Sequence, residues 1–241
     1  MLDHEYAAFV RPAIDRAYSA MRTGGRSHVL EVLDSAGIRP GFILDFYFGL
    51  LARPMPPDGF AAATTYRSPD MGLVVEHDLA SKDEDGSWRL TDAGREFSVR
   101  VMNAVGAGAE EVWGREPLGT LPWVQPLPRL ADLLGRLLES GAASGGPAFR
   151  ALAPPYEAPD ATPATVVAGR MGALRHHRAD AHRAAWAAAG FTRDELLAVP
   201  MEDPRRRTVE DDTNRRDVPI YAALTEQERL EFLALLAALP G

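Results

Sequence analysis

The chain has 241 residues, with 26 Lys and Arg against 34 Asp and Glu, a net charge of −8 and no cysteine. The lack of cysteine excludes disulfides, thiol catalysis and cysteine-ligated metal sites, and the acidic balance disfavours non-specific attraction to nucleic acid or anionic lipid. Although 46% of the residues are hydrophobic, no apolar run reaches the ~18 residues of a membrane helix, and no signal peptide is evident. We therefore expect a cytoplasmic protein with a sizeable core and no membrane partner.

Helical periodicity and capping signals predict a series of helices at the start of the chain. Apolar residues at helical spacing predict a first helix over 3–22, and Ser27 is expected to cap a second helix that ends at Ser35. Pro40 is expected to begin a third helix, which is apolar nearly all round and therefore buried or at an interface. Two shorter helices are predicted at 58–66 and 68–79, the second of them capped by Ser68 and Pro69.

A two-stranded hairpin and a long helix are predicted next. Ala80–Lys82 and Ser87–Leu90 are short extended segments around Asp85-Gly86, a pair typical of a type I′ turn. Thr91 is expected to cap a helix that continues to about Trp113. A short helix, a two-stranded wing and a long helix in this order are the parts of a winged-helix domain.

The second half of the chain is predicted to be helical after a linker. A stretch rich in Pro and Gly at 114–128 precedes a leucine-rich helix at 127–140, and 141–163, with five prolines, is expected to be an ordered loop or a mobile lid. A second long helix is expected at 165–189, and capping boxes at Thr192–Glu195 and Thr225–Glu228 open two further helices. The fold class expected is mainly α with a small β-wing. The predicted units are a winged-helix domain with flanking helices over 1–114, a linker with one helix over 115–163 and a helical domain over 164–241.

The segment Trp88-Arg-Leu-Thr-Asp-Ala-Gly-Arg95 resembles the wing-to-helix junction of MarR-type regulators and of the dimerisation domains of small-molecule O-methyltransferases. The methyltransferase alternative fails, because no glycine-rich loop follows a strand to hold S-adenosylmethionine and too little chain remains for a Rossmann domain. We therefore expect no cofactor. The MarR resemblance implies a homodimer that pairs through the helices at 3–22 and 92–113.

The parts that contact DNA in such domains carry the wrong charge here. Between Ser68 and Asp85, six acidic residues stand against Lys82 alone. DNA carries one negative charge per ~1.7 Å, so a surface that binds it needs Lys and Arg. The segment is therefore interpreted as a scaffold or dimer-forming module or as part of a ligand site, with DNA binding as the less favoured alternative. A basic surface made by Arg53, Arg67 and Arg89 would favour DNA binding.

The helix expected at 165–189 carries two polar residues on its apolar face. At ~100° per residue, Arg178 and His182 lie one turn apart on the face defined by Val167, Met171, Leu174, Ala181, Ala185 and Ala189. A buried guanidinium or imidazole is costly unless it is paired. A partner is therefore expected, either an acidic side chain at 210–212 or a polar ligand.

Three interpretations of this face remain open. The first is a structural ion-pair network that joins the helix to the segment 210–214. The second is a polar pocket in which His182 is a general base or acid, assisted by the carboxylate of Asp180 or Glu210, while Arg178 holds an anionic group. The third is a metal site, but the histidines at 176, 177 and 182 lack the i, i+4 spacing that a helical site favours, so no metal is expected.

A second resemblance covers the chain from residue 174 onward. The motifs at 174–182, 188–191, 209–214 and 219–224 are similar to those of an actinobacterial helix-turn-helix family of unknown function. In that family a winged helix lies between the motifs, whereas here only residues 191–208 do. The resemblance implies that one constellation is formed by Arg178, Asp180, His182, Glu210, Thr213 and Asn214.

These observations predict a winged-helix protein adapted to bind an organic small molecule between its halves, in bacterial specialised metabolism. Cofactor-free acid–base chemistry on that molecule is the mechanism considered. Trp123 beside the linker, together with Tyr66 and Arg67 in a turn, complete the expected ligand-binding residues. The alternative is a MarR-like, ligand-responsive DNA-binding regulator. A purely structural module would have no cavity between the halves and would pair Arg178 and His182 fully within the protein.

Overall fold

The computed structural model describes residues 3–38, 44–66, 71–114, 126–200 and 202–240. Over these ranges the protein is mainly helical and has one two-stranded antiparallel sheet. This confirms the predicted fold class at the level of a mainly α protein with a small sheet. No helix of the described ranges is long and apolar enough to cross a membrane.

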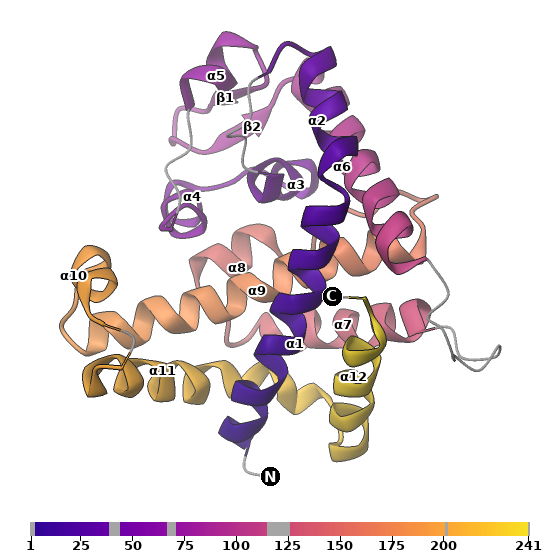
Figure 1. Cartoon of the computed structure of the whole chain (residues 1–241). Coiled ribbons are helices and arrows are strands. Elements are labelled where there is room, and N and C mark those ends of the chain that lie inside the picture. The colour runs from indigo at the N-terminus through magenta and orange to yellow at the C-terminus, as the bar shows by residue number, and fades with distance from the viewer. Residues whose placement is uncertain (1–2, 39–43, 67–70, 115–125, 201, 241) are drawn as a thin grey trace.

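Figure 1 shows the order of the elements. The first half of the chain forms α1 (Asp3–Gly24), α2 (Arg26–Ser35), α3 (Leu44–Ala52), α4 (Pro57–Ala63), α5 (Met71–Glu76), β1 (Ala80–Lys82), β2 (Trp88–Leu90) and α6 (Asp92–Trp113). The second half forms α7 (Pro126–Gly141), α8 (Pro147–Leu152), α9 (Pro163–Ala188), α10 (Arg193–Ala198), α11 (Pro204–Asp217), the 3₁₀ helix η1 (Val218–Ala223) and α12 (Glu226–Ala238).

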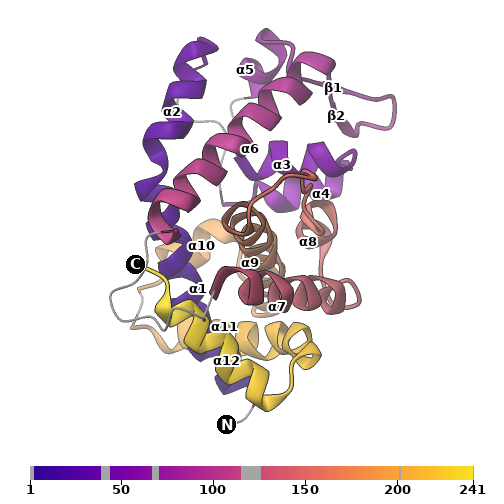
Figure 2. The same cartoon turned by 90° about the vertical axis from the view of Figure 1, so that its right-hand side faces the viewer.

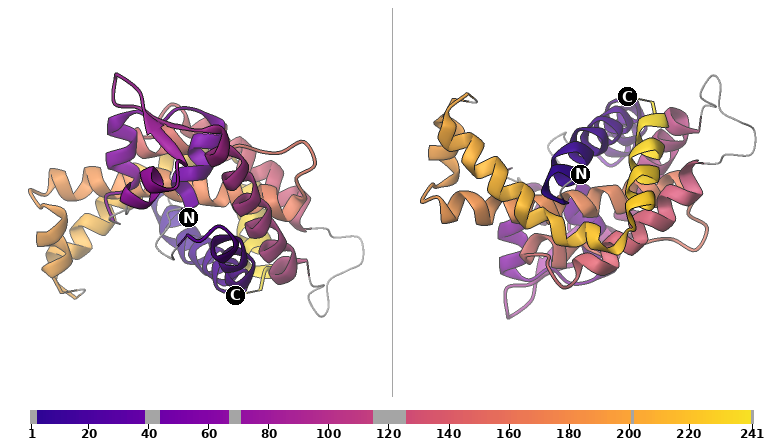
Figure 3. Two further views of the ribbon diagram at one scale, coloured as in Figure 1. Left: turned by 90° about the horizontal axis from the view of Figure 1, so that it is seen from above. Right: turned by 90° about the horizontal axis from the view of Figure 1, so that it is seen from below.

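The long helix α9 lies at the centre of the molecule. Figure 2 shows it nearly end-on, with α7, α8, α6 and α11 around it, and these helices all contact it. Its residues Val167 and Met171 are completely buried, and a continuous hydrophobic core extends from Tyr6 to Leu239. A small second cluster joins the end of α9 to α10 and α11, which together project to one side (Figure 3).

Helix α1 links the two halves of the chain. It contacts α2 and α6 as well as α9, α11 and α12. The hydroxyl of Tyr6 donates to the carbonyl of Arg229 over 2.9 Å, and its ring meets that of Tyr221 edge-on at 5.3 Å. Arg16 donates to the carbonyls of Leu236 and Leu239 over 2.6 and 2.8 Å, which satisfies carbonyl groups at the end of α12. The domain boundaries predicted at 114 and 164 stay a prediction.

The hairpin has the predicted strands but a different turn. β1 and β2 pair antiparallel with Ala80 opposite Leu90. The N–H of Asp83 donates to the carbonyl of Ser87, and the N–H of Gly86 donates to the carbonyl of Asp83. A type I′ turn needs two residues with positive φ, whereas in this turn Gly86 alone has one, at +82°. The predicted type I′ turn is therefore wrong, and the loop is a three-residue connection with glycine in the left-handed region.

The predicted side-chain caps at three helix starts are confirmed. The hydroxyl of Thr91 accepts from the N–H of Gly94, and both capping boxes, at Thr192 and Thr225, are formed. The predicted cap at Ser27 is wrong, because Ser27 lies inside α2 and the N-cap of that helix is Gly25. Pro40, Ser68 and Pro69 lie outside the described residues.

Two segments are more ordered than the sequence suggested. The stretch 141–163, expected as a loop or lid, contains α8, so the structure describes two helices between 126 and 162 where the sequence predicted one. The polar stretch after Pro200, for which no element was predicted, forms α11. Asp203 caps this helix, and an ion pair between Asp212 and Arg216 at i, i+4 spacing adds local support. Both helices pack on α9, and α11 supplies Glu210 to the candidate site described below.

Candidate functional site

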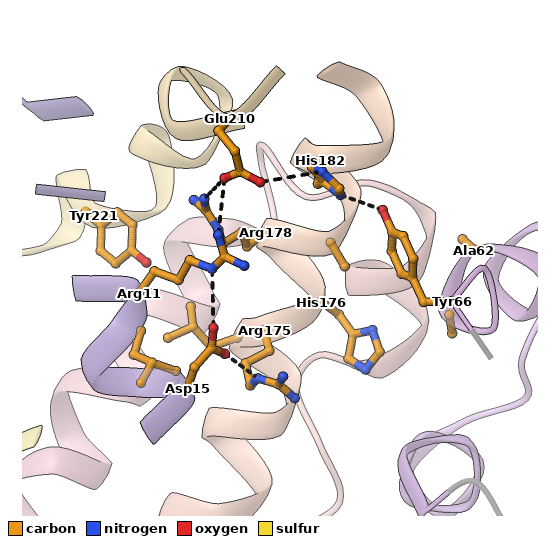
Figure 4. A pocket seen from close by; sticks show the side chains of 14 residues that line it. Arg11, Asp15, Ala62, Tyr66, Arg175, His176, Arg178, His182, Glu210 and Tyr221 are labelled. Atoms are coloured by element: carbon orange, nitrogen blue, oxygen red, sulfur yellow. Dashed lines mark hydrogen bonds and ion pairs between the residues drawn. The ribbon is translucent and has the colours of Figure 1, made fainter. Parts of the chain in front are cut away.

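A pocket of about 340 Å³ lies where α1, α4, α9 and α11 meet (Figure 4). Helix α9 supplies most of the wall, and elements from both halves of the chain complete it. The polar side chains that line the pocket are Arg11, Asp15, Tyr66, Arg175, His176, Arg178, His182, Glu210 and Tyr221. A cavity between the halves is what a purely structural module would lack.

Helical spacing brings the central residues to the pocket. Leu174, Arg178 and His182 are four residues apart, so they lie on one face of α9, and all three line the cavity. Leu174 is buried, whereas Arg178 and His182 are half-buried. The apolar face predicted for this helix is otherwise buried as far as Ala185, but Ala189 follows the end of the helix and is exposed.

Glu210 of α11 is the acidic partner of this face. Its Oε2 accepts from Arg178 over 3.0 Å and from Arg11 over 3.2 Å, while its Oε1 lies 3.7 Å from Nε2 of His182. The structure therefore brings together three residues that the sequence analysis selected, Arg178, His182 and Glu210. The distance to His182 exceeds that of a hydrogen bond, so Nε2 stays available to a ligand.

Tyr66, which follows α4, contacts the other nitrogen of the same imidazole. Its Oη lies 2.8 Å from Nδ1 of His182 and accepts from Nε1 of Trp186 over 3.2 Å. Burial raises the pKa of Tyr66 and lowers the pKa of His182, although the nearby Glu210 carboxylate opposes the second shift. Both side chains are therefore neutral at pH 7, so the phenol donates to Nδ1 and the imidazole carries its proton on Nε2.

The lowered pKa of His182 predicts a loss of stability in mild acid. Below about pH 6.5 the imidazole of His182 takes up a proton in the unfolded chain before it does so in the folded chain. The free energy of unfolding therefore decreases as the pH is lowered, until the pH drops below the folded-state pKa. We expect His182→Gln to be less sensitive to pH in this window than the wild type, in urea titrations at several pH values. An NMR titration of the imidazole should give a midpoint below 6.5. A midpoint above 6.5 would contradict the assignment.

Cationic side chains outnumber carboxylates in the pocket. Asp15 accepts from Arg11 over 3.3 Å and from Arg175 over 3.1 Å, so the lining holds three arginines and two carboxylates, Asp15 and Glu210. Behind the lining, Arg178 also lies 3.5 Å from the buried Asp217. Arg11 and Asp15 were not anticipated, because nothing in the sequence links α1 to residues more than 150 positions away. Ile14 and Leu174 supply the apolar part of the lining.

Asp180 lies away from His182. It is buried, and its carboxylate accepts from the N–H groups of Ala148 and Phe149 over 3.3 and 2.8 Å at the start of α8. It also pairs with Arg183. Side chains two positions apart on a helix point in different directions, which is why Asp180 does not join the predicted constellation.

Thr213 and Asn214, two further residues of the predicted constellation, do not line the pocket. Thr213 is buried and donates to the carbonyl of Val209 over 2.7 Å. The amide oxygen of Asn214 is buried without a hydrogen-bond partner in the described part of the chain, and Asn214 is not part of the lining. Trp123 and Arg67 lie outside the described residues.

Basic residues near the hairpin are engaged within the chain. Lys82 lies over the ring of Trp88 at 4.9 Å, and Arg89 pairs with Asp83. Arg53 donates to the carbonyls of Ala153 and Pro154 over 2.9 and 2.7 Å. Two of the three arginines whose convergence would favour DNA binding, Arg53 and Arg89, are therefore used in separate internal contacts.

The sequence analysis also missed a buried histidine on α9. His177 faces α8 and α11, and its neighbour His176 lines the pocket. Among the described residues no group of three or more His, Cys, Asp and Glu side chains is placed to hold a metal ion.

Comparison with protein-family models, with curated proteins and with solved structures gives no match.

Proposed function

We propose that the protein binds a small organic anion, such as a carboxylate with an apolar body, in the pocket between α1, α4, α9 and α11. The observation that carries the proposal is the excess of arginine over carboxylate around a cavity of about 340 Å³. This volume lies within the ~300–1,000 Å³ common for small-molecule sites. Arg178 is the group best placed to hold the anion, because it lines the cavity and its guanidinium already binds carboxylates, those of Glu210 and Asp217.

The pocket also has groups suited to proton transfer. In this proposal His182 gives or takes a proton at Nε2, Tyr66 fixes the orientation of the ring from Nδ1, and Glu210 stabilises the charged imidazolium. These roles require no cofactor. Binding is the core of the proposal, and acid–base chemistry on the bound molecule is its extension.

The scaffold of this site is proposed to be a winged helix adapted to a new role. The order α5, β1, β2 and α6 supports that assignment. The acidic residues around the hairpin and the internal contacts of Lys82 and Arg89 disfavour the DNA-binding alternative. The DNA-binding alternative requires an affinity for DNA that weakens steeply between ~50 and ~200 mM salt. We expect no DNA binding at either salt concentration. The homodimer implied by the MarR resemblance stays a prediction.

The test is binding of matched carboxylates and amides, such as benzoate with benzamide and hexanoate with hexanamide, by calorimetry and thermal shift. We expect the carboxylates to bind and the amides not to. Arg178→Ala should weaken carboxylate binding about 10- to 100-fold, the value of a charge-assisted hydrogen bond. Arg215→Ala is the matched control, because Arg215 is an exposed arginine on α11 that pairs with Asp212. The proposal fails if no carboxylate binds, or if Arg178→Ala binds as tightly as the control.

A further inference from the structure

Three side chains outside this pocket form a second hydrogen-bonded chain. Oγ of Ser144 lies 2.9 Å from Nε2 of His177, and Nδ1 of His177 lies 2.7 Å from Oδ1 of Asp217. Ser144 belongs to the turn after α7, His177 to α9 and Asp217 to the end of α11. A hydroxyl, an imidazole and a carboxylate joined in this order can activate serine as a nucleophile, whatever their order along the chain.

The burial of these three residues differs in the way that such chemistry needs. His177 is 2% exposed and Asp217 is 1% exposed, whereas Ser144 is open to solvent. The carboxylate accepts the proton of Nδ1, which leaves the lone pair of Nε2 directed at the serine hydroxyl. The ring of Phe149 meets the imidazole edge-on at 5.3 Å and helps to fix its plane.

The turn that carries Ser144 is held close to the histidine. The N–H groups of Ser144 and Gly145 donate to the carbonyl of Gly141 over 3.1 and 2.7 Å. A Cβ atom on Gly145 would lie 2.2 Å from the ring of Phe149, and one on Gly146 would lie 2.6 Å from Cγ of Asp180. Only glycine fits this close approach. His177 contacts Ser144 within the turn, and Asp180 binds the N–H groups that follow the turn at the start of α8. Two residues of α9 therefore hold the turn at both ends.

A second pocket, of about 740 Å³, lies beside this cluster between α7, α8 and α9. Ala142, two residues before Ser144, and Phe149, which contacts His177, both line it. Leu138, Pro154 and Pro155 add apolar surface, and the charged members of the lining are Glu139, Arg150, Glu157 and Arg170, of which the last two pair with each other. The apolar part of this lining suits an uncharged ester with an apolar acyl group.

We propose that Ser144, His177 and Asp217 form a serine-hydrolase site for such esters. Oγ of Ser144 attacks the ester carbonyl carbon while Nε2 of His177 takes the hydroxyl proton. The bond to the alcohol oxygen then breaks, and the alcohol leaves with that proton. Water, deprotonated by His177, attacks the acyl-serine, so that the carboxylic acid is released and Ser144 regains its proton. Asp217 is a positioning residue that holds the ring of His177.

The N–H of Gly146 is the group in the turn that we assign to the developing oxyanion. It donates to no acceptor among the described residues, whereas the N–H groups of Ala148 and Phe149 are occupied by Asp180. None of the three proposed residues lines the pocket around Arg178, although Asp217 also pairs with Arg178 at 3.5 Å.

The experiment is labelling of the full chain with a fluorophosphonate probe, followed by mass spectrometry of the modified peptide. We expect a single adduct on Ser144, formed when Oγ displaces fluoride from phosphorus. Ser144→Ala should lose the adduct and the hydrolysis of p-nitrophenyl hexanoate. His177→Gln should lower the labelling rate by ~100-fold or more, the contribution of a general base. Ser140→Ala, one turn earlier on α7, is the matched control and should label like the wild type.

Asp217→Asn separates positioning from structural support. If Asp217 orients the imidazole, the labelling rate falls while the final stoichiometry remains one adduct per chain. A purely structural role would lower the stoichiometry with the folded fraction and leave the rate of the folded protein unchanged. Wild-type protein without an adduct on Ser144, or Ser144→Ala that hydrolyses the ester like the wild type, would overturn the proposal and leave the serine as a cap on a buried histidine.

Discussion

Asp217→Ala should destabilise the protein by about 3–5 kcal/mol, the loss expected when one partner of a buried charged network is removed. Asp217 is almost completely buried, accepts from Nδ1 of His177 over 2.7 Å and pairs with Arg178 at 3.5 Å. Its removal leaves the imidazole N–H without an acceptor in the core. The free energy of unfolding in urea, followed by circular dichroism, measures the effect.

Two further variants serve as controls for the loss expected from Asp217→Ala. Asp217→Asn keeps an acceptor for His177 and should cost less, about 1–3 kcal/mol. Asp212 lies on the same helix in a partly exposed ion pair with Arg216, so Asp212→Ala should lower the free energy of unfolding by at most about 1 kcal/mol. Equal losses for Asp217→Ala and Asp212→Ala would show that the buried network does not stabilise the fold.

Tyr6→Ala should destabilise the protein by a similar amount, about 3–5 kcal/mol. Tyr6 is 1% exposed and packs against Tyr221, and its hydroxyl bonds the backbone of α12. The truncation therefore leaves a cavity between α1 and the last helices of the chain. The shift in the urea midpoint, at an unchanged slope, gives the cost.

The contributions of the ring and the hydroxyl can be separated. Tyr6→Phe removes only the bond to the carbonyl of Arg229 and should cost about 0.5–1.5 kcal/mol. Phe9→Ala, on the same helix but 65% exposed, should stay within about 0.5 kcal/mol of the wild type. A large loss for Phe9→Ala would mean that truncating an aromatic side chain on α1 is costly even where it is exposed, so the loss for Tyr6→Ala could not be assigned to burial.

Elements with a strong local signal were predictable from the sequence. Thr91, Thr192 and Thr225 each precede a helix with the side-chain pattern of a cap, and the structure forms all three caps. The two strands followed from the turn signal at Asp85-Gly86, and the long helices followed from helical spacing and capping residues. Their existence and type depend on neighbouring residues, which the sequence displays directly.

Elements stabilised mainly by tertiary contacts were not predictable. The helix α11 has few apolar residues to show a periodicity, and it forms because Val209 and Thr213 pack on α9 while exposed charges pair along its surface. The helix α8 has only six residues and follows a glycine-rich turn. Its N-terminus is satisfied by Asp180, a residue of a different helix.

The candidate site was predictable only in part for the same reason. Helical geometry placed Arg178 and His182 on one face of α9, and the acidic stretch suggested Glu210 as their partner. Arg11 and Asp15 reach the pocket from α1 through packing that no local pattern encodes. No local pattern linked His177 and Asp180 to the chain before α8, whereas in the structure both residues bind the segment between α7 and the start of α8.

The contact between the first and last described helices has a consequence for biosynthesis. The residues joined by the Tyr6 hydroxyl are 223 positions apart, so a ribosome completes α1 long before its partner α12 exists. Until then Tyr6, which is buried in the finished protein, lacks the part of its surroundings that α12 supplies. Closure over such a sequence separation is slow, and exposed apolar surface invites aggregation meanwhile. We therefore expect nascent chains that end before α12 to depend on chaperones far more than the complete chain does.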